Sequence, residues 1–105
     1  MNHLLLAMAI GAASFAATDA SAQTAKPTVV LVHGAFADAS SWNGVIRILE
    51  KDGYPVVAVA NPLRGARSDA SYVAGVLDAI KGPVILVGHS YGGIVISMAA
   101  IGKSN

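Results

Sequence analysis

The sequence predicts an α/β domain in which a parallel sheet is built from βαβ crossovers. Three short runs of β-branched and apolar residues lack polar alternation, as strands do when both faces of their sheet are covered. Segments with apolar residues at helical spacing separate and follow these runs. Strands that alternate with helices in this way form parallel units with right-handed crossovers. We therefore expect three strands and about three helices.

The first predicted strand is Thr28–Val32. The segment after it repeats apolar side chains at the i, i+3, i+4 and i+7 positions of an amphipathic helix. Those side chains are Trp42, Val45, Ile46 and Leu49. Ser40 or Ser41 can cap the start of this helix, and Gly53 can end it.

A second buried strand is predicted over residues 54–60 and is followed by a turn-rich stretch over 61–67. Ser68 or Asp69 can cap the next helix, whose apolar residues again repeat at helical spacing. The Gly-Pro pair at 82–83 ends that helix. The chain thus reaches its third strand after two complete strand-helix units.

The third predicted strand comprises residues 84–87. It is followed directly by the pattern Gly-x-Ser-x-Gly, formed by Gly88, Ser90 and Gly92. An apolar helix is expected after the pattern, over 94–101. Between a strand and a helix, this pattern is typical of a nucleophile elbow. The sharp turn strains the backbone of the serine, and the small residues on either side let the turn close. Ser90 would then project above the sheet at a helix N-terminus, where free N–H groups favour negative charge. An ordinary turn serine is the alternative.

The loop after the first strand, residues 33–36, can approach the same serine. The carboxyl ends of neighbouring parallel strands meet at one edge of a sheet, so this loop and Ser90 share that edge. Two backbone N–H groups can then face one oxyanion. We interpret His33 and His89 as structural residues rather than bases, and Asp38 as a turn or cap residue.

With these features the chain resembles the N-terminal half of an α/β-hydrolase, in the small branch that contains carboxylesterases, methylesterases and hydroxynitrile lyases. The resemblance rests on Val32-His33-Gly34-Ala35-Phe36, Trp42 and Gly88-His89-Ser90-Tyr91-Gly92-Gly93. It extends from Thr28 to about Gly102. It implies a truncated α/β-hydrolase fold, with residues 23–105 forming an incomplete N-terminal part of the domain.

The resemblance also assigns roles. It implies that Ser90 is the nucleophile and that the backbone N–H groups of Ala35 and Tyr91 form the oxyanion hole, with Phe36 the less favoured second donor. The residues that would support this geometry are His33, Gly34, Gly88 and Gly92. No cofactor and no metal are implied.

Two features depart from the family pattern. The loop after the second strand lacks the acidic residue often found near its start and has Asn61-Pro62 there, so we assign it no catalytic role. After Ser90, the fifteen residues to Asn105 contain no Asp, Glu or His. A serine needs a base, and the base needs a carboxylate, and in this fold both follow the serine along the chain.

Three hypotheses about function follow. The first is an N-terminal fragment of a serine carboxylesterase that acts on a small-molecule ester when completed by the missing half. The second is a non-catalytic truncated product or a small-molecule-binding remnant. The third keeps the fold and changes the chemistry to that of a lyase or a cofactor-free haloperoxidase. In every case we expect the 105 residues alone to be inactive, because the base is missing.

Residues 1–22 have the features of a signal peptide. An uncharged apolar stretch over 4–18 is too short to span a membrane, and Ala20-Ser21-Ala22 offers small residues at both positions of a cleavage site. We therefore expect a periplasmic or secreted protein that begins at Gln23, with no stable membrane insertion after cleavage.

Composition excludes several other classes. The 105 residues contain no cysteine, which rules out disulfides, thiolate catalysis and cysteine zinc sites. The net charge is only +1 and the basic residues are scattered, so no nucleic-acid partner is expected. An apolar content of 54% with 12% charged residues argues for a packed core rather than disorder.

Overall fold

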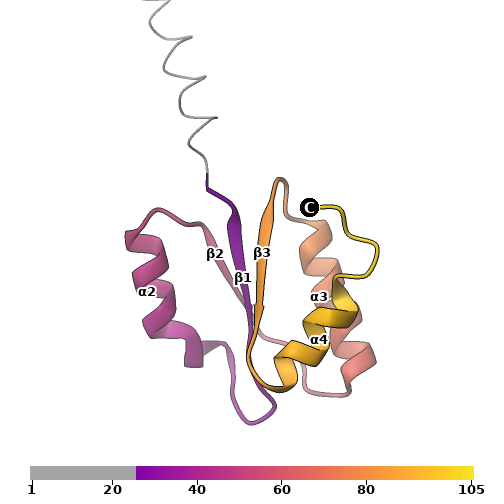
Figure 1. Cartoon of the computed structure of the whole chain (residues 1–105). Coiled ribbons are helices and arrows are strands. Elements are labelled where there is room, and N and C mark those ends of the chain that lie inside the picture. The colour runs from indigo at the N-terminus through magenta and orange to yellow at the C-terminus, as the bar shows by residue number, and fades with distance from the viewer. Residues whose placement is uncertain (1–25) are drawn as a thin grey trace, which may run out of the picture.

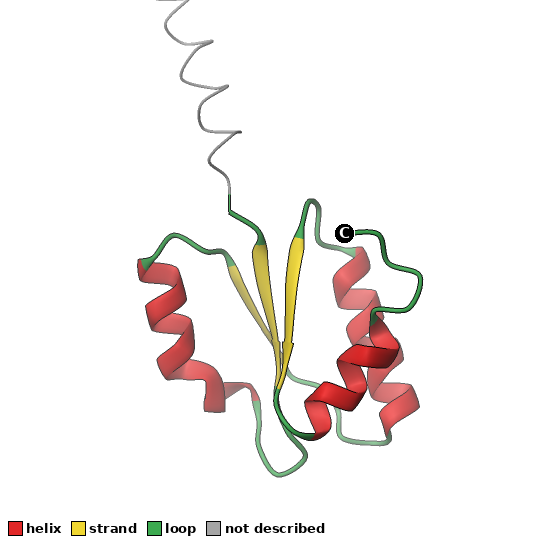
Figure 2. Ribbon diagram, viewed as in Figure 1, coloured by secondary structure: helices red, strands yellow, loops and turns green. Residues whose placement is uncertain are grey.

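A computed structural model of the chain describes residues 26–105, so the predicted signal peptide over 1–22 lies outside the described residues. The described part is a three-stranded parallel sheet with helices on both faces (Figures 1 and 2). This confirms the predicted α/β class. The strands are β1 (Thr28–Val32), β2 (Val56–Val59) and β3 (Val84–Gly88). The helices are the short 3₁₀ helix η1 (Ala39–Trp42), α2 (Asn43–Lys51), α3 (Ala66–Asp78) and α4 (Tyr91–Ala99).

Strand β1 is the centre of the sheet, which has the order β2-β1-β3. Val29 pairs with Val56 on one side and with Ile85 on the other. Because β1 has a strand on each edge and a helix layer on each face, Val30 and Val32 are fully buried. The parallel register brings the carboxyl ends of all three strands to one edge, at the bottom of Figure 1.

The core lies on the face of the sheet that α3 and α4 cover (Figure 2). Its buried members are Val30, Val32, Val59, Ala70, Val73, Leu77, Val95 and Ala99. Helix α2 lies on the opposite face and contributes no buried residue. The two layers are therefore packed to different extents.

Two of the predicted helix starts were wrong. Asp38, not Ser40 or Ser41, supplies the first cap: its side chain accepts a hydrogen bond from the Ser40 N–H at 2.9 Å, and the turn that follows is 3₁₀ before α2 begins. Helix α3 begins at Ala66, ahead of both predicted caps, because Gly65 at φ 155° turns the chain into it.

The start of the last helix also differs from the prediction. Helix α4 begins at Tyr91, immediately after Ser90, whereas the apolar pattern predicts a start at 94. The glycines at 92 and 93 both lie in the helix, and Gly92 packs closely against β1. The second strand is shorter than predicted, and Gly53 ends α2 as predicted, at φ 89°.

The outer edge of β3 has no strand partner in the described part of the chain. Val84 donates its N–H to the backbone oxygen of Asn105 at 3.1 Å, and Ile85 is 45% exposed. Among residues 26–105, no helix is both long and apolar enough to cross a membrane.

Candidate active site

The turn between β3 and α4 has the geometry of a nucleophile elbow. Ser90 adopts φ 54° and ψ −121°, a region that L-residues rarely occupy and that costs about 1–3 kcal/mol. A Cβ on Gly88 would lie 2.5 Å from the Gly92 oxygen, and one on Gly92 would lie 2.3 Å from the Val32 oxygen. Only glycine fits at these two positions, because Gly88 packs on the backbone that follows Ser90 and Gly92 packs on β1.

The loop after β1 lies against this elbow. A Cβ on Gly34 would lie 3.3 Å from the His89 oxygen and 3.6 Å from the Ser90 Cβ. A hollow of about 220 Å³ opens here, lined by Gly34, Ala35, Phe36, Ala37, His89 and Ser90. The structure therefore brings together the loop and the serine, as the shared sheet edge predicts.

The backbone N–H groups of the two predicted oxyanion donors differ from those that follow them in the first turn of α4 and in the loop after β1. In the first turn of α4 the N–H groups of Gly92 and Gly93 donate to the carbonyls of His89 and Ser90, at 2.9 and 2.8 Å. No described backbone carbonyl accepts from the N–H of Tyr91 or of Ala35. Their role in binding an oxyanion stays a prediction.

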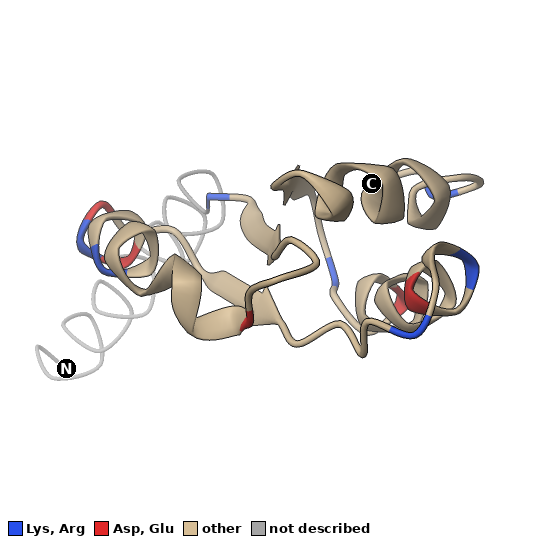
Figure 3. Cartoon of the chain, turned by 90° about the horizontal axis from the view of Figure 1, so that it is seen from below, with Lys and Arg blue, Asp and Glu red and all other residues tan. Residues whose placement is uncertain are grey.

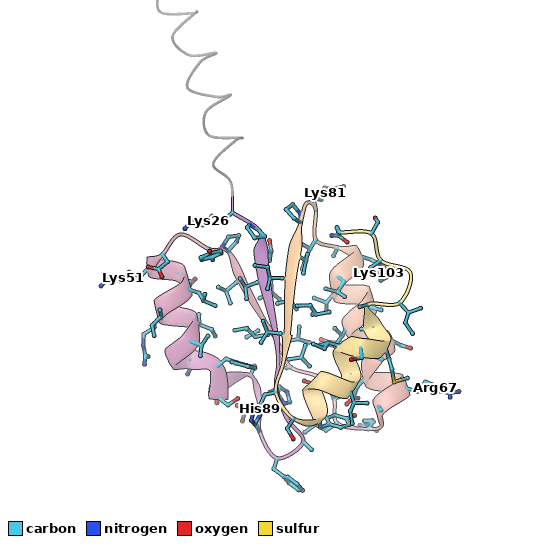
Figure 4. All side chains as sticks on the ribbon, in the orientation of Figure 1. Lys26, Lys51, Arg67, Lys81, His89 and Lys103 are labelled. Atoms are coloured by element: carbon cyan, nitrogen blue, oxygen red, sulfur yellow. The ribbon has the colours of Figure 1, made fainter. Side chains whose placement is uncertain are left out.

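The two histidines near the elbow differ in environment. His33 is 2% exposed, and its Nδ1–H donates to the Gly34 oxygen at 2.8 Å, so it is held within its own loop as predicted. His89 is exposed at the carboxyl-end edge of the sheet (Figure 4). It lines both the hollow at Ser90 and a second one of about 230 Å³ with Ser41, Trp42 and Val45.

Asp38 is a cap residue, as predicted. Besides the Ser40 N–H it accepts from the Ser40 hydroxyl, and these hydrogen bonds hold the pKa of its carboxyl below the usual value. The charged form of Asp38 thus stabilises the start of η1 and is not aimed at the serine.

The structure adds one residue that the sequence analysis interpreted only as a helix cap. Asp69 is fully buried. Its carboxylate accepts from the Tyr91 hydroxyl at 2.6 Å and from the N–H groups of Leu63 and Arg64 at 3.0 and 3.2 Å. The missed signal is its spacing: Asp69 lies four residues before Val73, on the buried face of α3.

Burial and hydrogen bonding act in opposite directions on this carboxylate. Burial raises the pKa of Asp69, but the hydrogen bonds from Tyr91, Arg64 and Leu63 outweigh it and leave the pKa below the usual value. The same hydrogen bond raises the pKa of Tyr91 to about 12, with burial and the Asp69 charge adding to it. At neutral pH the pair is a carboxylate bound to a neutral phenol.

The surroundings of Ser90 carry little charge. Seen from the carboxyl ends of the strands, α4 has no acidic or basic side chain (Figure 3). Within residues 26–105, no group of three His, Cys, Asp or Glu side chains is placed to hold a metal ion. The site thus combines a serine of strained backbone with a hollow that is lined by the loop after β1 and by His89.

Comparison with known proteins identifies the family of the chain. Residues 29–104 match the model of the alpha/beta hydrolase family, which is most of the chain. The chain belongs to the alpha/beta hydrolase family.

Three curated relatives share the same region. The Arabidopsis thaliana protein that bears the name methylesterase 11, chloroplastic, is 36% identical over 83 residues, which cover 67% of this chain and 21% of that protein. Norfluorocurarine synthase 2 of Strychnos sp is 37% identical over 90 residues, which cover 73% of this chain and 34% of that protein. The alpha/beta hydrolase nvfD of Aspergillus novofumigatus (strain IBT 16806) is 33% identical over 89 residues, which cover 75% of this chain and 36% of that protein.

The chain thus spans between about a fifth and about a third of the length of these relatives. No solved structure matches it significantly.

Proposed function

We propose that this chain carries the nucleophile and the oxyanion loop of a serine hydrolase that cleaves small carboxylic esters without a cofactor. The observation that carries the proposal is the backbone of Ser90, held in a strained conformation by Gly88 and Gly92 and facing the loop at Gly34. The family and the names of two relatives, a methylesterase and a hydrolase, support it.

In the proposed reaction, the Ser90 Oγ attacks the ester carbonyl and its proton passes to a base. The carbonyl oxygen becomes an oxyanion that accepts hydrogen bonds from the N–H groups of Ala35 and Tyr91. The C–O bond of the ester breaks, the alcohol leaves with the proton, and water then hydrolyses the acyl-serine. The uncharged lining by Ala35, Phe36 and Ala37 favours a neutral substrate.

The base and its carboxylate form the second part of the proposal. His33 is held by its own loop, and no Asp, Glu or His follows Ser90 up to Asn105. We place both groups in sequence beyond these 105 residues, which accords with the greater length of the relatives. The coding DNA past Asn105 tests this: an open frame that encodes an Asp and a later His supports it, and a stop with no such segment in any frame contradicts it.

The signal peptide predicted over residues 1–22 supports a further part of the proposal, that the protein acts in the periplasm or outside the cell. Its partner there would be the small-molecule ester, with no nucleic acid involved.

Phosphonylation with added imidazole tests the nucleophile. An alkyl fluorophosphonate is mixed with the 105-residue chain, and imidazole replaces the missing base. The Ser90 Oγ–P bond forms, the P–F bond breaks, fluoride leaves and imidazole takes the hydroxyl proton. By peptide mass spectrometry, we expect Ser90 to react at least about 10-fold faster than the other serines of residues 26–105, because among these Ser90 alone lies beside the proposed oxyanion donors.

Two variants control this experiment. Ser90→Ala should abolish the fast reaction, while Ser97→Ala, which removes an exposed serine from the same helix, should leave it unchanged. Equal labelling of all serines would reject the hydrolase proposal and favour the non-catalytic alternative.

Without added imidazole we expect no turnover of a p-nitrophenyl ester above the Ser90→Ala control. Loss of the base and acid lowers the rate of such a site by roughly 10⁴-fold or more. Serine-dependent turnover by the unaided chain would show that a described residue serves as the base.

One relative is named as a synthase. This name favours a second candidate function, in which the same fold carries out non-hydrolytic chemistry such as that of a lyase. Product analysis separates the two in a protein completed by the missing segment. A carboxylic acid and an alcohol indicate a hydrolase, and any other product pair indicates the second candidate.

A further inference from the structure

Asp69 is a fully buried carboxylate that the proposed reaction does not use. It lines neither hollow at the elbow, so it cannot touch a substrate bound there. A buried charge is costly unless hydrogen bonds compensate it, and Asp69 receives three, from Tyr91, Leu63 and Arg64. These three hydrogen bonds compensate the buried charge of Asp69.

The three donors come from two segments that begin at the carboxyl-end edge of the sheet. Leu63 and Arg64 belong to the loop after β2, and Leu63 itself adopts a positive φ of 62°. Tyr91 is the first residue of α4 and lies 22 residues from Asp69 along the chain. One carboxylate on α3 therefore ties the loop after β2 to the residue that directly follows Ser90.

The hydrogen bond at 2.6 Å is the shortest of the three and is made by the Tyr91 side chain. The peptide between Ser90 and Tyr91 carries one of the proposed oxyanion donors. Gly92 packs against the Val32 oxygen of β1, and Gly88 packs against the backbone of Gly92 and Gly93. A phenol fixed at its hydroxyl restricts the rotation of that ring and of the peptide that bears it.

We propose that Asp69 is a positioning residue of the oxyanion hole: by holding the Tyr91 hydroxyl it fixes the direction of the Tyr91 N–H beside Ser90. This inference rests on the proposed function. The alternative is a merely structural role, in which Asp69 only fastens the loop at Leu63 and Arg64 to α3. The two roles differ in what Tyr91→Phe does, since this variant keeps the ring, the loop and the charge of Asp69.

The test uses the 105-residue chain and the imidazole-assisted phosphonylation of Ser90. We expect Tyr91→Phe and Asp69→Asn each to slow the reaction about 10-fold, a fraction of the 10²–10³-fold lost when an oxyanion donor is removed outright. The double variant should be no slower than the worse single one, because Asp69→Asn weakens and Tyr91→Phe removes the same hydrogen bond. Tyr72→Phe, on the exposed face of α3, is the matched control and should keep the parent rate.

A second readout does not depend on reactivity. In ¹H–¹⁵N NMR spectra, the amide signals of residues 89–93 should broaden or double in Tyr91→Phe and stay sharp in Tyr72→Phe. Phosphonylation within twofold of the parent, with sharp signals at the elbow in Tyr91→Phe, would overturn the positioning role. If the parent shows no fast labelling but Tyr91→Phe still broadens these signals, the proposed function fails while the positioning of the Tyr91 N–H stands.

Discussion

The two faces of the sheet differ sharply in how tightly they are packed. On the side of α3 and α4, Val73 and Val95 are fully buried against β1. On the other side α2 buries no residue, and its Ile48 is 65% exposed. The elbow belongs to the first side, since α4 begins at the residue after Ser90.

Because of this difference, the elements that pack against the elbow at Ser90 are not the elements that line the second hollow beside it. Beside Ser90, Gly92 packs against β1, and the hydrogen bond between Asp69 and Tyr91 joins α3 to α4. Helix α2 and its neighbour η1 instead supply part of the second hollow, through Trp42 and Val45. We infer that changes on the α2 side alter what surrounds the site, whereas changes on the α3 and α4 side alter the elbow itself.

The largest effect should come from the tightest contact on the packed side. Gly92→Ala places a Cβ 2.3 Å from the Val32 oxygen, a backbone atom that cannot move aside, so we expect the free energy of unfolding to fall by about 3 kcal/mol or more. Gly93→Ala meets nothing within 4 Å and should stabilise α4 by about 0.5–1 kcal/mol. Urea denaturation followed by circular dichroism measures both. Equal losses would show that the elbow is not locked to β1.

A matched pair of core and surface truncations compares the two faces directly. Val73→Ala opens a cavity in a fully buried site and should cost about 2 kcal/mol. Ile48→Ala removes more atoms but from an exposed site on α2, and should change the free energy of unfolding by no more than about 0.5 kcal/mol. A loss at Ile48 as large as that at Val73 would mean that α2 is as firmly packed as α3.

The smallest effect is the pH dependence of the tie between Asp69 and Tyr91. The pKa of Asp69 lies below 3.8 in the folded chain, so its stabilisation is complete above that pH and is lost as the pH falls through the folded pKa. The pKa of Tyr91 is raised from 10.0 to about 12, so its stabilisation is complete below pH 10 and is lost as the pH rises towards 12.

Urea midpoints of the parent and of Asp69→Asn measure this dependence across the pH range. The parent should be the more stable chain at neutral pH, and the difference should shrink at both ends of the range. A difference that stays constant below pH 3.8 and above pH 10 would show that the two groups are not coupled to folding.

Local pattern is sufficient to predict the strands next to the site. The apolar run of β1 has the bounds that the sequence predicts, and β3 extends one residue further, to Gly88. The glycine spacing around Ser90 predicts the elbow because the steric requirement is contained within five residues. The loop at Gly34 reaches the serine because parallel strands end at one edge.

Tertiary packing decides the features that the sequence analysis missed. The apolar run from residue 94 predicts the helix, but α4 also includes Gly92 and Gly93, and Gly92 packs on β1. Asp69 satisfies the rule for a helix cap, but its partners Leu63 and Tyr91 are brought to it by the loop and by α4. Propensity and capping rules describe neighbours along the chain, and these contacts lie between distant segments.

The place of β1 in the sheet has a consequence for folding during synthesis. The first strand to leave the ribosome is the central one, and Thr28 pairs with Val84, which is made 56 residues later. At the usual pace of translation of 5–20 residues per second, one side of the most buried of the three described strands waits about 3–11 s for its partner. Over that interval the nascent chain should therefore depend on a chaperone that covers the unpaired edge of β1.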